Sequence, residues 1–455
     1  MAEWLAIVDL TCPRRDAAIR WVGNAPVIDL WFKKAFREFT AGKVAGMKEA
    51  MQARPTLEQT SLEAGDLAPQ AQVPEIDCFL AAALGREPIP WPAVWEHDEH
   101  GTAVVERIAY HGIAGLLNDR SKGLAGWPDG ILAEVRDISF SQAMWETRHR
   151  IVLGQVIATF TQAGIRSLFL KGTGLAYDLY PNPATRTRGD SDVLIDRAQL
   201  NHARGVLADL GFVADPNVAG LSDDVHLQEI WRLEHPDDSR HDLDVHWQVM
   251  NSFALSTVLD VETCFTGAID LPRLAPHALT LDHVSMLVHT ALHKATHIVS
   301  PYFAGGRAHF GGDRLIWGYD IHLLAQVLST DDWARLVQMA RDDGTAEVCL
   351  AALAFARDRL GTDVPRRVLD DLHRAVPYDR QSGFLLRSSQ LDRAWRDLRA
   401  VAGWRSKAAY FGTRLLPAPA FVRTKYPELA DRPLVVLYLH RLMGLFRERT
   451  RRGQP

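Results

Sequence analysis

Two short segments in which acidic side chains alternate with other residues constrain the fold of this chain more than any other feature. Asp190 and Asp192 open one apolar run, and Asp242, Asp244 and His246 alternate with leucine, valine and tryptophan in a second. Successive side chains of a strand point to opposite faces of a sheet. Both segments are therefore predicted to be strands with an acidic face for a site, and the second also has an apolar face for the core.

The spacing of Asp190 and Asp192 suits a divalent cation. Strand geometry points both carboxylates to the same side, where they repel each other unless a cation lies between them. Mg²⁺ is bound by one or two carboxylates, with water and substrate phosphates in the remaining positions. A solvated edge strand would explain a lone Asp-x-Asp pair equally well. If the strand of Asp244 lies beside this pair, three carboxylates can hold two metal ions, and Asp244 can take a proton from an acceptor hydroxyl.

A short apolar run leads directly into Lys171-Gly172-Thr173 and a second glycine, which indicates a strand, a tight turn and a helix. Glycine lets backbone N–H groups approach an anion closely, and a helix N-terminus adds a favourable partial charge. We therefore expect this turn to hold a triphosphate, with Lys171 and Arg188 neutralising its charge. Taken alone, the turn sequence would fit an ordinary strand-to-helix connection.

Apolar spacing predicts an α+β architecture, with a small mixed sheet and its flanking helices placed between helical N- and C-terminal regions. Strand and helix patterns alternate only in the middle of the chain, and helical spacing occupies most of the rest. We expect five segments: a helical appendage (1–54), a linker (55–74), a helical lead-in (75–164), a core that carries the acidic strands (165–275) and a helical C-terminal domain (276–455).

Charge and cysteine content exclude several classes of protein. The 51 basic and 56 acidic residues leave a net charge of −5, so the chain lacks the positive field that collects nucleic acid, and we expect no duplex nucleic acid partner. Its four cysteines lie far apart without a CxxC pair, as is typical of a reducing cytoplasm. The N-terminus lacks a signal-peptide pattern, and the clean apolar run at 434–439 is too short to span a bilayer. We therefore expect a soluble, cytoplasmic protein without an integral membrane segment.

Taken together, the motifs resemble the polymerase-β-like nucleotidyltransferase superfamily, in which a strand and a glycine-containing turn precede an Asp-x-Asp pair and a separate strand with one aspartate. More narrowly, the segments LKGTGLAYDLY, RTRGDSDVLI and LDVHW, together with a helix that ends in LGF, are similar to an uncharacterised bacterial nucleotidyltransferase family. The similarity covers roughly residues 100–330.

The resemblance implies that residues 165–275 form a nucleotidyltransferase-type catalytic core. It also implies transfer of a nucleoside monophosphate from a nucleoside triphosphate, with ATP favoured, with two Mg²⁺ ions and with loss of pyrophosphate. Carried over residue by residue, Asp190, Asp192 and Asp244 would bind metal and perform catalysis, while Gly172 and Thr173 would hold the phosphates. Thr173 stands where the superfamily usually has glycine or serine, so a hydroxyl is retained. The acceptor, whether small molecule, sugar, peptide or protein, stays open.

Two other functions fit part of the pattern. A glycosyltransferase can also use Asp-x-Asp and a metal to hold a sugar nucleotide, but it explains neither the Lys-Gly-Thr turn nor the separate strand of Asp244. A non-catalytic nucleotide-binding or regulatory module could keep the same fold, but the presence of all three aspartates favours activity.

A row of histidines is a weaker signal. His289, His293 and His297 recur every four residues on one face of a predicted helix, a spacing that can present imidazoles to a metal. The glutamate of an HExxH motif does not accompany them. A structural role, or a contact with the active-site cleft, is therefore favoured over zinc binding.

Overall fold

The computed structural model describes residues 73–451, apart from positions 86, 96–97, 125, 216–222, 236–238, 301, 305–306, 310, 380, 418, 420–421, 424–425, 427–428 and 430. The predicted appendage at 1–54 and all but the last two positions of the predicted linker at 55–74 lie outside the described residues. The first helix begins at Val73, within two residues of the predicted start of the lead-in.

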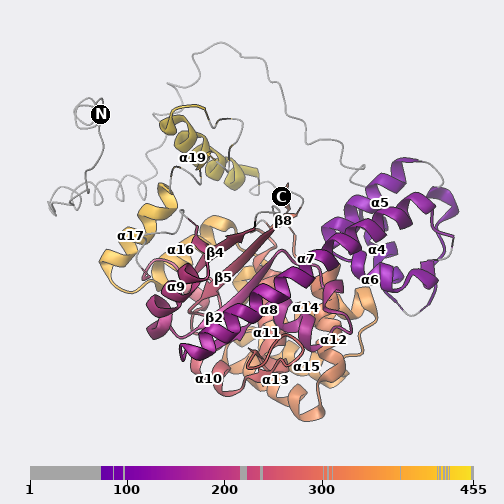
Figure 1. Cartoon of the computed structure of the whole chain (residues 1–455), viewed down its shortest axis with the longest axis horizontal. Helices are drawn as coiled ribbons and strands as arrows, with labels where there is room; N and C mark the ends of the chain where they lie inside the picture. Colours follow the sequence, from indigo (N-terminus) through magenta and orange to yellow (C-terminus); the bar gives the residue numbers. More distant parts are fainter. Residues whose placement is uncertain are drawn as a thin grey trace. The chain divides into compact units, whose positions relative to one another are not determined.

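Four helices precede the sheet, and the last is the longest of the described helices. They are α4 (Val73–Ala83), α5 (Asp98–His111), α6 (Ala114–Asp119) and α7 (Asp129–Gln162). Figure 1 shows α7 in front of the strands of the sheet. Its buried residues come from both halves, and those after Glu146 recur every three or four positions, which turns one side of the helix toward the sheet.

A seven-stranded mixed sheet has the strand order β3-β4-β5-β2-β1-β7-β6. Its strands are β1 (Ser167–Phe169), β2 (Asp190–Ile195), β3 (Val213–Ala214), β4 (Gln228–Glu234), β5 (Arg240–His246), β6 (Ile269–Asp270) and β7 (Leu279–Thr280). The pairs β2–β5 and β1–β7 are parallel, and the other neighbours are antiparallel. The predicted acidic strands are β2 and β5, and the predicted α+β class with a mixed sheet is confirmed.

Three helices connect these strands. They are α8 (Lys171–Asp178), α9 (Leu200–Asp209) and α10 (Val261–Thr266). The predicted helical stripe that ends before Gly211 is α9, and Gly211 has φ +88°. A glycine adopts this left-handed conformation without steric cost, so it ends the helix as expected.

The two faces of the sheet pack against different helices. On one face, Val193 and Val245 share an apolar cluster with residues of α7 and α9. On the other face, Leu168 and Leu194 share a larger cluster with α11 (His283–Thr296). Because alternate residues of a strand face opposite sides, the side chains of Asp190 and Asp192 lie on the α11 side and that of Ser191 lies on the α7 side.

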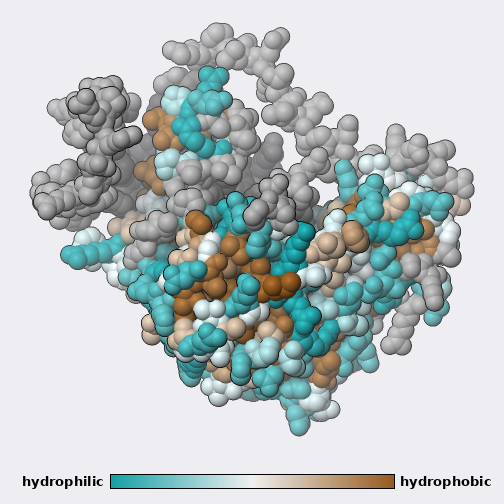
Figure 2. Space-filling view, in the orientation of Figure 1, coloured by the Kyte–Doolittle hydropathy of each residue, from teal (hydrophilic) through white to brown (hydrophobic). Residues whose placement is uncertain are grey.

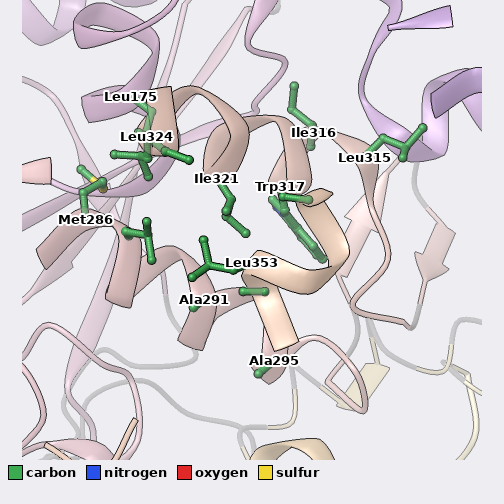
Figure 3. Close-up of a cluster of buried hydrophobic side chains, with 14 of the residues drawn as sticks. Leu175, Met286, Ala291, Ala295, Leu315, Ile316, Trp317, Ile321, Leu324 and Leu353 are labelled. Carbon is green, nitrogen blue, oxygen red and sulfur yellow. The ribbon is translucent and has the colours of Figure 1, made fainter. Parts of the chain in front are cut away.

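The C-terminal part is helical, as predicted. It comprises α11, α12 (Leu315–Val327), α13 (Thr330–Asp342), α14 (Ala346–Leu360), α15 (Arg366–Ala375), α16 (Gln390–Ala400), α17 (Trp404–Leu415) and α19 (Leu434–Arg451). Between α11 and α12, the short strands β8 (Tyr302–Ala304) and β9 (Arg307–His309) form an antiparallel pair. Figure 3 shows side chains of α11, α12 and α14 meeting in a buried apolar cluster, with Ala291, Trp317 and Leu353 among them. This cluster joins the helical part to the α11 face of the sheet.

The face shown in Figure 2 is mostly hydrophilic, with an apolar area over the region of α7 and the neighbouring strands. Among the described residues, Phe140, Met144 and Ile151 of α7 are exposed apolar side chains. Their spacing places them along one outer side of the helix. In the part of the chain that the structure describes, none of the helices combines the length and apolar character needed to cross a membrane.

Candidate active site

The parallel pairing of β2 with β5 brings the predicted carboxylates together. Asp192 lies directly opposite Asp244 in the register, and Asp190 lies opposite Asp242. Residues that are paired in register have their side chains on the same face, so all four carboxylates are on the α11 side of the sheet. The neighbouring position of the two acidic strands, on which the predicted three-aspartate site depended, is therefore confirmed.

Asp192 is the most strongly engaged of these carboxylates. It is 6% exposed, and its Oδ1 atom accepts a hydrogen bond from Lys171 Nζ at 2.6 Å and another from His246 Nε2 at 2.9 Å. Desolvation alone would raise the pKa of Asp192, but Lys171 and His246 hold that pKa far below its usual value. Asp192 therefore carries a negative charge, and its Oδ1 atom accepts two hydrogen bonds.

The pKa values of Asp190 and Asp244 are raised, whereas that of Asp192 is lowered. Desolvation and the charge of Asp192 raise the pKa of Asp190 to about 6, although this residue at the start of β2 keeps an exposed surface. Desolvation and the charges of Asp190 and Asp192 raise the pKa of Asp244 well above its usual value. Gln228 Nε2 donates a hydrogen bond to Asp244 Oδ2 at 3.1 Å. The cluster therefore holds more carboxylates than it can keep charged without an added cation.

These residues fit a divalent metal ion. One ligand atom from each of Asp192, Asp244 and His246 lies within 4.8 Å of the others. Asp190 lies two residues before Asp192 in β2, on the same face of the sheet. Carboxylate oxygens are the preferred ligands of Mg²⁺ and Mn²⁺, and imidazole is a common ligand of other divalent ions. The raised pKa values of Asp190 and Asp244 give the same indication, because a bound cation would relieve the repulsion that raises them.

The turn after β1 begins helix α8 at Lys171. Lys171 has φ +46°, the left-handed region that residues other than glycine rarely adopt. The N-cap residue Leu170 provides no side-chain hydrogen bond to the first turn of α8. The first backbone N–H groups of this helix therefore keep the free donors and the positive partial charge with which helix N-termini bind anions.

Thr173 and Arg188 belong to a polar network on the opposite, α7 side of the sheet. The Thr173 hydroxyl lies 2.6 Å from the Ser191 hydroxyl and accepts a hydrogen bond from Arg188 Nε at 3.1 Å. Arg188 also donates to Glu146 of α7 at 2.7 Å, and its side chain is 4% exposed. Tyr177 donates to the same Glu146 oxygen at 2.5 Å. The network holds the turn at Lys171 against α7. It also engages the guanidinium of Arg188, which the sequence predicts to neutralise the charge of a triphosphate.

Because Gly172 has no side chain, the side chains of Arg188 and Arg186 can lie close to its backbone. A Cβ atom at this position would lie 3.3 Å from Arg188 Cδ and 3.6 Å from the guanidinium carbon of Arg186. Arg186 is buried in an ion pair with Asp320 of α12. Tyr180 also donates to Asp320, at 2.7 Å. Arg186 therefore joins the core to the helical part of the chain.

The predicted histidine row lies on the carboxylate side of the sheet, with His289 and His293 in α11 and His297 as the residue that caps its C-terminal end. Burial lowers the pKa of His289 to about 3 and that of His297 to about 4, and it lowers the pKa of His293 well below its usual value; the nearby charge of Lys171 acts in the same direction on all three. The Nε2 atoms of His293 and His297 are 3.2 Å apart, and Trp317 stacks on His297. Neutral imidazoles thus lie within electrostatic range of Lys171.

Sequence reasoning assigned no role to His246 or Glu146. The signal for His246 was present, because it follows Asp244 by two residues in the alternating segment and so shares its face. The signal for Glu146 was weak: a charged residue among apolar ones in a long helix is usually exposed, and only its contacts with Arg188 and Tyr177 show that it is part of the site.

Comparison with known proteins places this geometry in a family. A family model described as an uncharacterised nucleotidyltransferase matches residues 98–361, a span that contains the seven-stranded sheet, the turn at Lys171, all three predicted aspartates and the histidine row. No curated protein matches the chain. Because the match covers more than half of the 455 residues, this protein belongs to that family of uncharacterised nucleotidyltransferases.

Proposed function

We propose that this protein is a metal-dependent nucleotidyltransferase of the polymerase-β-like superfamily, which moves a nucleoside monophosphate from a nucleoside triphosphate, with ATP favoured, to a hydroxyl or phosphate acceptor. The observation that carries the proposal is the pairing of Asp192 with Asp244 beside the uncapped first turn of α8. Paired carboxylates suit a divalent cation, and free N–H groups suit phosphates. Phosphoryl transfer needs both at one place.

The α8 turn has the groups needed to hold the triphosphate. We assign the backbone N–H groups of Gly172 and Thr173 to the phosphates, with the ammonium of Lys171 as an added positive charge. The Thr173 hydroxyl and the Arg188 guanidinium are occupied by Ser191 and Glu146. These two side chains support phosphate binding by keeping the turn in place, and Arg188 adds its charge from behind the turn.

The carboxylates orient and activate the reactants. Bound divalent ions, held by Asp190, Asp192 and Asp244, would neutralise charge on the phosphates. An acceptor oxygen attacks the α-phosphorus, the bond from that phosphorus to the bridging oxygen breaks, and pyrophosphate leaves. We assign Asp244, which lies opposite Asp192 on β5, to accept the proton of the acceptor. His246 keeps Asp192 in position through the hydrogen bond at 2.9 Å.

Calorimetric titration with each nucleoside triphosphate, with and without Mg²⁺, tests this function. We expect Mg²⁺-dependent binding to the wild type and none to an Asp190→Ala/Asp192→Ala double variant, because the variant lacks two of the three carboxylates of the cation site. The triphosphate that binds most tightly identifies the preferred base. Binding of sugar nucleotides in place of triphosphates would overturn the proposal in favour of a glycosyltransferase.

Metal affinity should depend on pH. The raised pKa values of Asp190, about 6, and of Asp244 mean that protons occupy both carboxylates in acid and compete with the metal. Affinity for Mg²⁺ should therefore rise as pH increases through about 6, and binding should release protons. Titrations between about pH 5 and pH 8, in buffers with different ionisation enthalpies, measure both effects. A constant affinity over this interval would show that protons on these two carboxylates do not compete with the metal.

A further inference from the structure

The ammonium group of Lys171 lies where a cation is expected. Its Nζ atom is 2.6 Å from Asp192 Oδ1, and its side chain is 22% exposed. Desolvation alone would lower the pKa of Lys171, but the negative charges of Asp192, Asp244 and Asp190 raise it. The lysine forms an ion pair with Asp192, and the charges of the other two carboxylates assigned to the metal also act on it.

The backbone of Lys171, the residue that carries this ammonium group, is strained. Lys171 has φ +46° at the first residue of α8, where a glycine would be unstrained. Left-handed conformations at non-glycine residues persist where the surrounding structure holds them, and they concentrate at functional sites. The strain places a cationic side chain at the junction between two groups of ligands, the carboxylates of β2 and β5 and the free N–H groups of the α8 turn.

Lys171 and a metal ion would compete for the Oδ1 atom of Asp192. Oδ1 already accepts hydrogen bonds from Lys171 and from His246, so a cation that binds this oxygen must displace a donor. Of the two donors, the lysine has the long flexible side chain and an alternative partner within reach, the phosphates of a nucleotide on the α8 turn. His246 is 1% exposed and comes from the rigid strand β5.

We propose that Lys171 is a resident counter-ion of the carboxylate cluster, which competes with the metal for Asp192 and moves to the triphosphate when nucleotide binds. The inference rests on the proposed function, since it assumes that the cluster binds metal. In the free protein the lysine weakens metal binding. In the presence of nucleotide the same lysine strengthens the complex, so metal and nucleotide bind together more tightly than either binds alone.

Binding of Mn²⁺, followed by electron paramagnetic resonance in the absence of nucleotide, tests the competition directly. Lys171→Met removes the charge with little change in side-chain length, and Lys171→Arg is the matched control that keeps the charge. We expect Lys171→Met to bind Mn²⁺ at least about tenfold more tightly than the wild type, because one positive charge next to the site is removed. Lys171→Arg should not show this gain. Lys171→Gln replaces the methionine variant if circular dichroism shows that the latter is unfolded.

The second measurement adds a non-hydrolysable ATP analogue. With the analogue present, the order of the two affinities should reverse. Lys171→Met should bind the analogue with Mn²⁺ at least about tenfold more weakly than the wild type, because the phosphates no longer interact with an ammonium group. Equal Mn²⁺ affinity of wild type and Lys171→Met without nucleotide would overturn the competition while leaving the proposed function intact. Absence of Mn²⁺ binding in every protein, with and without the analogue, would instead overturn the proposed function on which it rests.

Discussion

Replacing Asp192 with asparagine should lower the rate of nucleotidyl transfer at least about 10³-fold, which corresponds to a loss of about 4 kcal/mol of transition-state stabilisation. The amide has nearly the same shape as the carboxylate, and its oxygen can still accept the hydrogen bond from His246. It has no negative charge with which to hold a cation. Lys171 keeps the neighbouring charges of Asp190 and Asp244, so the fold should survive. Pyrophosphate release from the preferred nucleotide in the presence of an acceptor measures the rate, and circular dichroism checks the fold.

Asp242→Asn is the matched control for this experiment. Asp242 lies on the same face of the sheet and pairs with Asp190 in the register, but its carboxylate is bound by Arg232 at 3.2 Å and by Arg240 Nε at 2.8 Å. We expect this variant to keep most of the activity, because the site does not use that carboxylate for a cation. Similar losses in both variants would mean that general electrostatics matter more than cation binding, and full activity of Asp192→Asn would remove Asp192 from the site.

Replacing Asp320 with alanine should lower the free energy of unfolding by about 3–5 kcal/mol, because it leaves a buried guanidinium without its partner. Asp320 is 1% exposed, and it accepts hydrogen bonds from Arg186 at 2.6 Å and from Tyr180 at 2.7 Å. Burial makes the loss large, since neither donor can turn to water without opening the contact between the core and α12. Urea denaturation followed by circular dichroism measures the change.

Two further variants separate the ion pair from general loss of side-chain contacts. Asp358→Ala removes an exposed carboxylate paired with Arg357 and should leave the denaturation midpoint unchanged within error. Arg186→Met combined with Asp320→Leu should be more stable than Asp320→Leu alone, because no buried charge is then left unpaired. If Asp320→Ala were as stable as the wild type, the pair would not hold the core and the helical part together.

Elements with a strong local pattern could be predicted from the sequence. Strand β5 alternates polar and apolar residues, and β2 is a short run in which Asp190 and Asp192 precede three apolar residues. Helix α9 has a helical stripe that ends before Gly211, and α11 and α12 repeat apolar residues at helical spacing. The pattern at 333–360 predicts helix, but the structure has two helices there, α13 and α14. Gly344, with φ +60°, separates them, and one glycine in a helical pattern does not by itself reveal a break.

Features that depend on tertiary placement could not be predicted. Strands β3, β6 and β7 are two residues long, which is too short to show any period. Glu146 and Arg188, and likewise Arg186 and Asp320, are far apart in the chain, so their ion pairs arise only once α7, β2 and α12 are packed. The three aspartates could be proposed from the sequence because each lies in a short local motif. The side chains that support them could not, because their roles come from contacts across the fold.

Parallel pairing of β2 with β5 ties assembly of the carboxylate cluster to the slow part of folding. Parallel neighbours need a long crossover, and contacts between distant residues form late because closing the loop costs entropy. Asp192 and Asp244 are therefore apart in the unfolded chain, and a ligand that needs both binds only the folded state. Such a ligand stabilises the protein by mass action. Thermal denaturation with Mg²⁺ and nucleotide present thus offers a way to search for the unknown acceptor, as the compound that raises the melting temperature further.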